Sequence, residues 1–141
     1  MGLAWLILEL QGSERERMLA RYCALVDAMD RFRMPNGLFH ANIDDPDSFA
    51  DCEGAAMLAY STMKLKSAGV THPSVTREAD WSRRLMAELE RHVDALGFIQ
   101  DCSGSPSFSE CGTSTEMQAF FLMLHAEIQK EKGASGDCFD E

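Results

Sequence analysis

The feature that most constrains this sequence is an internal repeat with a period of about 60 residues. In the first copy, residues 37–40 (Gly-Leu-Phe-His) precede residues 48–52 (Ser-Phe-Ala-Asp-Cys). In the second copy, residues 97–100 (Gly-Phe-Ile-Gln) precede residues 107–111 (Ser-Phe-Ser-Glu-Cys). Each copy leads into an apolar segment. We therefore expect two copies of one supersecondary unit that pack against each other.

Hydrophobic periodicity predicts that these units are helical. Mostly apolar helices are expected over residues 3–11, 48–67 and 113–132, and amphipathic helices over residues 13–32 and 75–96. Apolar helices are typical of inner positions and amphipathic helices of outer ones. No run has the alternation of a half-buried strand, so no sheet is expected. Ser13 with Glu16 and Ser48 with Asp51 predict two capping boxes.

Alternating inner and outer helices predict an all-α fold, an incomplete (α/α)6 toroid of about two and a half hairpins. A straight solenoid is the competing arrangement, but common helical solenoids have shorter repeats of about 34 to 47 residues. In a toroid, the long loops that precede the inner helices share one end of the ring. That end would gather the polar loop residues His40, Asn42, Asp44, Asp45, Ser103, Ser105 and Ser107.

Composition narrows the class of partner. The formal charge of −10 disfavours nucleic acid and anionic membrane surfaces, which attract basic proteins. No segment approaches the roughly 18 apolar residues of a membrane span, and no signal peptide is recognised, so a cytoplasmic location is expected. The five cysteines form no Cys-x-x-Cys pair, which disfavours a metal site. Cys102 and Cys111 are expected to be reduced, with a disulfide between them as the alternative.

Residues 36–40 (Asn-Gly-Leu-Phe-His) and 43–49 (Ile-Asp-Asp-Pro-Asp-Ser-Phe) carry a family resemblance. They resemble the Asp-Gly-Leu-Trp-His and Asp-Pro-x-Ser-Tyr blocks of unsaturated glucuronyl and rhamnogalacturonyl hydrolases, glycoside hydrolase families 88 and 105. Residues 55–60 and 115–122 are similar to inner helices of that group. The resemblance covers only the C-terminal portion of a six-hairpin glycosidase.

The resemblance implies a carbohydrate-active protein that binds an oligosaccharide with an unsaturated uronic acid end, without a cofactor. In that group, a carboxylic acid protonates the 4,5-double bond, water adds, and the resulting hemiketal collapses to release the neighbouring sugar. The aspartate that does this lies in an upstream Trp-x-Asp-Gly-like block. No such block occurs here, so no catalytic residue is assigned, and the chain by itself is expected to be inactive.

Three residues are candidates for substrate binding: His40, Asp45 and Glu53. His40 would contact sugar hydroxyls or the uronate, or else tether its own loop to the backbone. Asp45 belongs to an acidic turn around Pro46 that lacks the glycine and distal glutamate of a calcium loop. Glu53 is unusual on an inner helix, where a carboxyl needs a partner or a raised pKa.

A second hypothesis is a non-catalytic helical-repeat module for binding or assembly. Residues 3–8 contain no polar side chain, so a second copy of the chain or an upstream region is expected to cover this first helix. Residues 1–133 would form one partial toroid domain, followed by a polar tail over residues 134–141.

Overall fold

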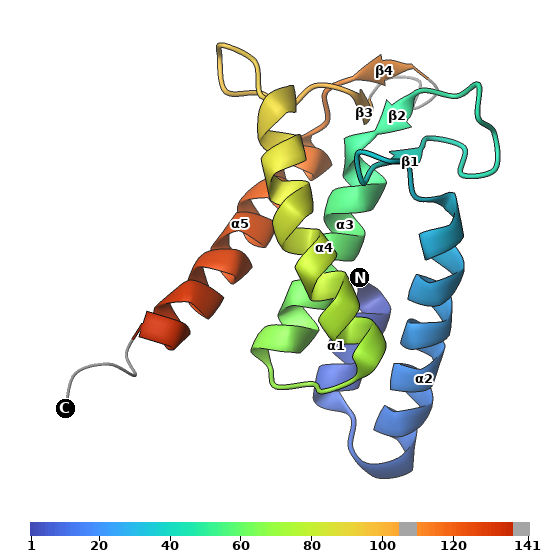
Figure 1. Ribbon diagram of the computed structural model, residues 1–141, viewed down its shortest axis with the longest axis vertical. Helices are drawn as coiled ribbons and strands as arrows, with labels where there is room; N and C mark the ends of the chain where they lie inside the picture. Colours follow the sequence, from blue (N-terminus) through green and yellow to red (C-terminus); the bar gives the residue numbers. More distant parts are fainter. Residues whose placement is uncertain (105–109, 137–141) are drawn as a thin grey trace.

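Helices dominate the computed structural model, which describes residues 1–104 and 110–136 (Figure 1). Within these ranges the helices are α1 (Gly2–Glu9), α2 (Gly12–Met29), α3 (Cys52–Ser67), α4 (Pro73–Leu89) and α5 (Thr115–Gly136). Short 3-10 turns, η1 (Asp30–Phe32) and η2 (Glu90–His92), continue α2 and α4. None of these described helices is long and apolar enough to cross a membrane.

The expected alternation of helices is confirmed. Figure 1 shows α1, α3 and α5 running in one direction, with α2 and α4 running the opposite way. The helix α3 packs against α4 and α5 along its length and contacts α1 near its end. Its Ala55, Ala56 and Ala59 are fully buried, because their small side chains let neighbouring helices approach closely. Thus α1, α3 and α5 take the inner positions, and α2 and α4 the outer ones.

Both predicted capping boxes are wrong. The helix α2 begins at Gly12, whose φ of +56° turns the chain, so that Ser13 already lies inside the helix. At α3 the capping residue is Asp51, whose carboxylate accepts hydrogen bonds from the backbone N–H groups of Glu53 and Gly54 at 3.2 Å. Ser48 instead donates to the Asp45 carbonyl oxygen at 2.8 Å, within the loop.

The expectation of no sheet is also wrong, although the strands are minimal. The strand β1 (Phe39–His40) pairs antiparallel with β2 (Ala50–Asp51), and β3 (Cys102–Ser103) pairs antiparallel with β4 (Cys111–Gly112). Strands of two residues are too short to produce an alternating pattern. Each pair closes the base of a long loop just before an inner helix begins.

The repeat is visible in the backbone. In the first copy, Met34 N–H donates to the Leu38 carbonyl at 2.9 Å, and Gly37 has a φ of +92°. In the second copy, Asp94 N–H donates to the Phe98 carbonyl at 2.8 Å, and Gly97 has a φ of +87°. Both turns lie at the same end of the bundle (Figure 1). The residues after Leu89 form η2 and then this glycine turn, so α4 ends at Leu89 rather than near residue 96 as expected.

A buried ion cluster joins the first turn to α4. The Glu78 carboxylate is 0% exposed and accepts hydrogen bonds from Arg33 and, at 3.0 Å, from Arg77. The Arg33 guanidinium lies 4.1 Å from the ring centroid of Trp81, where it forms a cation–π contact. These contacts hold the segment after η1 against the outer helix, which positions the loop that follows.

Replacing Glu78 with alanine should lower the free energy of unfolding by about 3 kcal/mol, because the buried Arg33 would keep only its ion pair with the more exposed Asp30. Urea unfolding followed by circular dichroism measures this loss. The matched control is Asp80→Ala, which breaks an exposed ion pair with Arg83 on the same helix and should cost less than about 1 kcal/mol. Equal losses for the two variants would contradict the role of Glu78.

Candidate functional site

The two long loops meet where α3 begins. Cys52 N–H donates to the Asp101 carbonyl at 2.9 Å, and Ser103 N–H donates to Asp51 Oδ1 at 3.0 Å. Asp51 therefore accepts from three backbone N–H groups, two in its own helix and one in the second loop. A single carboxylate both caps α3 and joins the two repeat units, so the loop end of the bundle is one connected surface.

A polar chain crosses this surface from one unit to the other. His92 Nδ1 is 2.7 Å from Asp101 Oδ2, and His92 Nε2 is 3.7 Å from Glu88 Oε1. Glu88 in turn accepts a hydrogen bond from Asn36 Nδ2 at 3.2 Å. The bond with His92, more than the one with the Cys111 thiol, holds the pKa of Asp101 below its ordinary value. Asp101 takes a left-handed φ of +58°, a conformation that aspartate tolerates better than most residues.

Cys102 and Cys111, which lie close to these polar groups, are free thiols. Cys111 Sγ donates to Asp101 Oδ1 at 3.2 Å. Loss of water around the sulfur, followed by this hydrogen bond, raises the pKa of Cys111 to about 11. Burial likewise raises the pKa of Cys102 to about 12. Thiols with such values are protonated at neutral pH and are poor nucleophiles, so this geometry does not favour cysteine catalysis.

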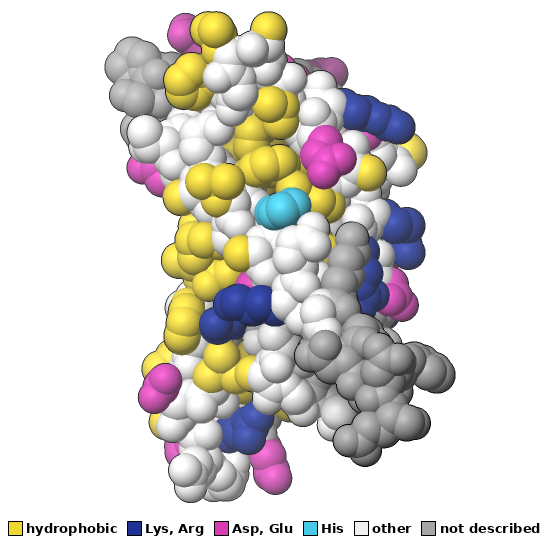
Figure 2. Space-filling model, turned by 90° about the vertical axis from the view of Figure 1, so that its left-hand side faces the viewer, with side chains coloured by type: hydrophobic (Ala, Val, Ile, Leu, Met, Phe, Trp, Pro, Cys, Tyr) yellow, Lys and Arg dark blue, Asp and Glu magenta, His cyan; other side chains and the backbone are white. Residues whose placement is uncertain are grey.

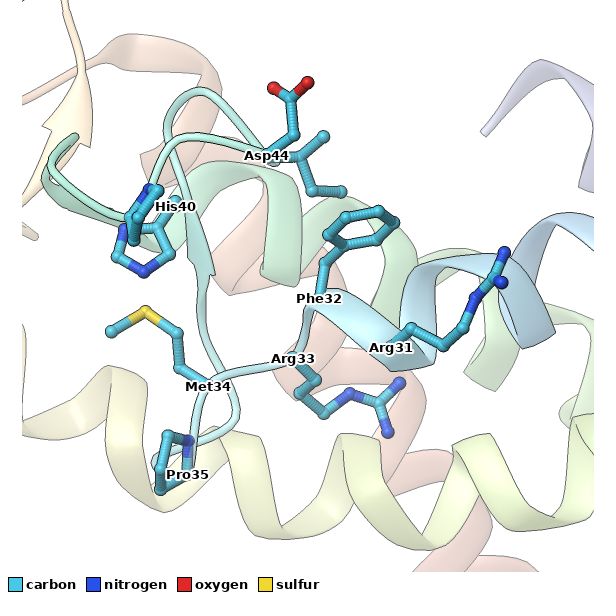
Figure 3. Close-up of a pocket in the computed structure, with 9 residues that line it drawn as sticks. Arg31, Phe32, Arg33, Met34, Pro35, His40 and Asp44 are labelled. Atoms are coloured by element: carbon cyan, nitrogen blue, oxygen red, sulfur yellow. The ribbon is translucent and has the colours of Figure 1, made fainter.

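A pocket opens between η1 and the first long loop (Figure 3). Its volume is about 390 Å³, and it is lined by η1 and the loop, namely Arg31, Phe32, Arg33, Met34, Pro35, His40, Ile43, Asp44 and Pro46. Figure 3 shows the His40 ring facing Met34, with Phe32 on the opposite side of the pocket. An apolar wall with a few polar groups is the usual form of a small-molecule site.

Of the three predicted substrate-binding residues, only His40 lines this pocket. Its Nδ1 lies 2.7 Å from the Ser48 carbonyl oxygen. A carbonyl only accepts, so Nδ1 donates, and in the neutral ring Nε2 is left as an acceptor. Asp45 Oδ1 accepts from the Asp47 N–H at 3.0 Å and shapes the turn. The substrate roles of these residues stay predictions.

Glu53 lies apart from the pocket, between α3 and the start of α5. Ser114 Oγ donates to Glu53 Oε2 at 2.8 Å and accepts from the Met117 N–H at 2.9 Å, so one hydroxyl caps α5 and binds the carboxylate. Burial raises the pKa of Glu53 above its ordinary value, and the Ser114 hydrogen bond opposes this shift.

Sequence reasoning missed the pairing of His92 with Asp101, because it assigned His92 to a long helix. The internal repeat could have indicated that His92 lies at the loop end of the bundle. His92 occupies the position in η2 that Phe32 occupies in η1, and both side chains reach the loop end of the bundle. Ser105 and Ser107 were expected at this end and lie outside the described residues. Among residues 1–104 and 110–136, no three His, Cys, Asp or Glu side chains are placed to hold a metal ion.

Ser114→Ala should raise the titration midpoint of Glu53 further, because the hydroxyl that stabilises its charged form is lost. A folded-state pKa above the unfolded value means that Glu53 contributes less stability as the pH rises through its titration range. The variant should therefore lose more stability than the parent does as the pH rises from about 4, near the unfolded-state pKa of a glutamate, through the raised folded-state pKa of Glu53. Carboxyl ¹³C NMR titration and urea unfolding measure both effects. Ser48→Ala is the control, and a Glu53 midpoint that stays in place in Ser114→Ala would contradict this assignment.

Comparisons with known proteins show which solved structures share this fold. No family model matches the chain, and no curated protein matches it. Two crystal structures do match, both described as a possible member of the GH105 family. One is from Salmonella enterica serovar Paratyphi A, with a TM-score of 0.74 and 18% identity. The other is from Klebsiella pneumoniae, with a TM-score of 0.75 and 17% identity.

Each comparison covers 92% of this chain but only 39% and 38% of the respective solved chains. The chain therefore spans less than half the length of the structures that it matches. Those structures are (α/α)6 toroids, and this chain corresponds to a part of one, consistent with the C-terminal portion that the sequence resemblance implies. The fold is thus an incomplete toroid of the kind seen in GH105 structures.

Proposed function

We propose that this chain forms one wall of a carbohydrate-binding cleft of the unsaturated glycuronyl hydrolase type, without supplying the catalytic aspartate. The observation that carries this proposal is the pocket that contains His40, at the loop end of a partial toroid. In such a ring the loops that precede the inner helices surround a common entrance. A ligand held there would contact several loops at once.

The pocket has the chemistry to hold a sugar. Phe32 is 40% exposed and, with Ile43, offers an apolar surface for the carbon face of a pyranose ring. His40 Nε2 can accept a hydrogen bond from a sugar hydroxyl, and the protonated ring can donate to a uronate carboxylate. Arg31 adds positive charge at the pocket, although the chain as a whole is acidic.

Catalysis would need a group that this sequence does not contain. Addition of water to the double bond of an unsaturated uronic acid requires a positioned acid within hydrogen-bond reach of the reacting carbon. The sequence resemblance assigns that role to an aspartate in an upstream block that is absent here. The chain by itself would therefore bind the sugar without hydrolysing it.

The second candidate function is a non-catalytic assembly module. One observation favours it: Trp5 and Leu6 on α1 and Leu122 on α5 are exposed hydrophobic side chains on inner helices. Inner helices normally bury such residues, and surfaces of this kind mark contact sites. The two candidates are compatible, because assembly would use the helix edges and sugar binding would use the loops.

Titration with an unsaturated uronyl disaccharide tests sugar binding. We expect NMR shifts in the pocket loop and an unchanged double-bond absorbance. His40→Asn keeps a donor near the Ser48 carbonyl but removes Nε2, and it should weaken binding about tenfold, equivalent to about 1.4 kcal/mol. His125→Ala, on the exposed face of α5, is the control. Absence of shifts at millimolar sugar would overturn the binding proposal, and loss of absorbance would overturn the claim of inactivity.

A further inference from the structure

The four histidines of this chain differ in what their rings contact. His92 lies against two carboxylates, His72 caps α4, and His125 is exposed on α5. Of the four, His40 is the one that lines the pocket beside η1, and its ring is hydrogen-bonded to a backbone carbonyl rather than to a carboxylate. A positive charge on this ring would therefore be available to a ligand in the pocket.

The His40 ring is held at one of its two nitrogens. Nδ1 donates to the Ser48 carbonyl oxygen at 2.7 Å. Ser48 is itself fixed, because its hydroxyl donates to the Asp45 carbonyl oxygen at 2.8 Å and accepts from the Asn42 N–H at 3.1 Å. Nδ1 carries a hydrogen in this neutral tautomer and in the protonated ring alike, so the bond to Ser48 persists in both charge states. Protonation therefore changes Nε2 from an acceptor to a donor without turning the ring.

We propose that the protonation state of His40 determines which sugars the pocket prefers, so that carboxylated sugars gain over uncharged ones as the pH falls. This inference rests on the proposed function of the pocket and specifies how its selectivity is regulated. A neutral Nε2 accepts a hydrogen bond from a sugar hydroxyl but has no hydrogen to offer to a carboxylate. A protonated Nε2–H donates to a carboxylate in a charge-assisted bond, which is roughly twice as strong as a neutral one.

Two arginines line the pocket with His40, and their charge is permanent. The Arg33 guanidinium is paired with the buried Glu78 and, at 2.6 Å, with Asp30, so its charge is compensated within the protein. Arg31 is exposed and attracts an anionic sugar equally at every pH near neutrality. A preference that depends on pH must therefore come from a group that titrates.

The carboxylates near the ring leave its charge unmatched. Asp44 and Asp47 are exposed on the loop, and in Figure 3 the Asp44 carboxylate points away from the His40 ring. The remaining carboxylates of the elements that pack at this end accept hydrogen bonds elsewhere, namely Asp45 in the loop, Asp51 on β2, Glu53 on α3, and Glu78 and Glu88 on α4. Among the described residues no carboxylate is hydrogen-bonded to His40, so a ligand carboxylate can neutralise the protonated ring.

Isothermal titration calorimetry with an unsaturated uronyl disaccharide and its methyl ester tests this assignment from about pH 5.5 to about pH 8, where imidazole titrates. The free acid stays ionised over this range, whereas the ester has no negative charge. We expect the ratio of the two affinities, acid over ester, to rise about tenfold as the pH falls. Near neutral pH the acid should take up a fraction of a proton as it binds, so that its binding enthalpy varies with the ionisation enthalpy of the buffer.

Two substitutions remove the titrating ring in different ways. His40→Gln places an uncharged amide near the position of Nε2, and His40→Asn places one near Nδ1. In both variants the ratio of affinities should no longer change with pH, and proton uptake should vanish. Arg31→Gln should weaken binding of the acid at every pH but keep the dependence on pH, because it removes a permanent charge. Circular dichroism checks that each variant is folded.

The control is His125→Ala, at an exposed position on α5. Helix α5 lies on the side of the molecule shown in Figure 2, where hydrophobic side chains form a band, and this side is opposite to the first long loop in Figure 1. This variant should keep the pH dependence of the parent chain.

Three results would contradict the inference. A constant ratio of the two affinities across this pH range would overturn it while leaving sugar binding itself intact. A ratio that still rises in both His40 variants would also overturn it, because another group would then carry the proton. Failure of both sugars to bind at any pH would overturn the proposed function, and this inference with it.

Discussion

The structure depends on the close packing of α3, which other helices cover on several sides. Its buried alanines bring α4 and α5 near, and Tyr22 of α2 reaches the same helix through a 2.7 Å hydrogen bond to Thr62. A helix enclosed in this way cannot be stable alone, because its apolar surface is distributed around its circumference. The repeat unit therefore exists only as part of a row, and α1 and α5 end that row with surfaces suited to further helices.

Polar contacts then determine how the loops sit on this row. Asp51 accepts hydrogen bonds from both repeat units. Asp101 is hydrogen-bonded to the His92 ring and to the Cys111 thiol. These carboxylates are occupied by neighbouring donors, which makes them structural groups of the loop end. The groups that remain for a ligand lie in the pocket beside η1, where His40 has one nitrogen tethered and one available. The groups proposed to bind a ligand and the carboxylates that hold the loops together are thus different residues.

The fold was predictable from the sequence because its signals are local and repeated. Helical periodicity, the two glycine turns and the shared Ser-Phe-x-acid-Cys string together predicted inner and outer helices and loops at one end. The capping boxes and strands were mispredicted because each depends on where the chain turns. At α2, Gly12 turned it before Ser13, and at α3, Ser48 bonded within its own loop while Asp51 became the cap.

What the sequence by itself determined is the order and character of the helices, since apolar spacing along the chain decides which face each helix buries. It also placed His40 on the loop where the pocket lies. Only the tertiary structure decided that Glu53 binds Ser114, that Asp45 shapes a turn, and that His92 meets Asp101. Those contacts join residues on separate elements or across a reversed chain, and their geometry follows from packing that no local pattern encodes.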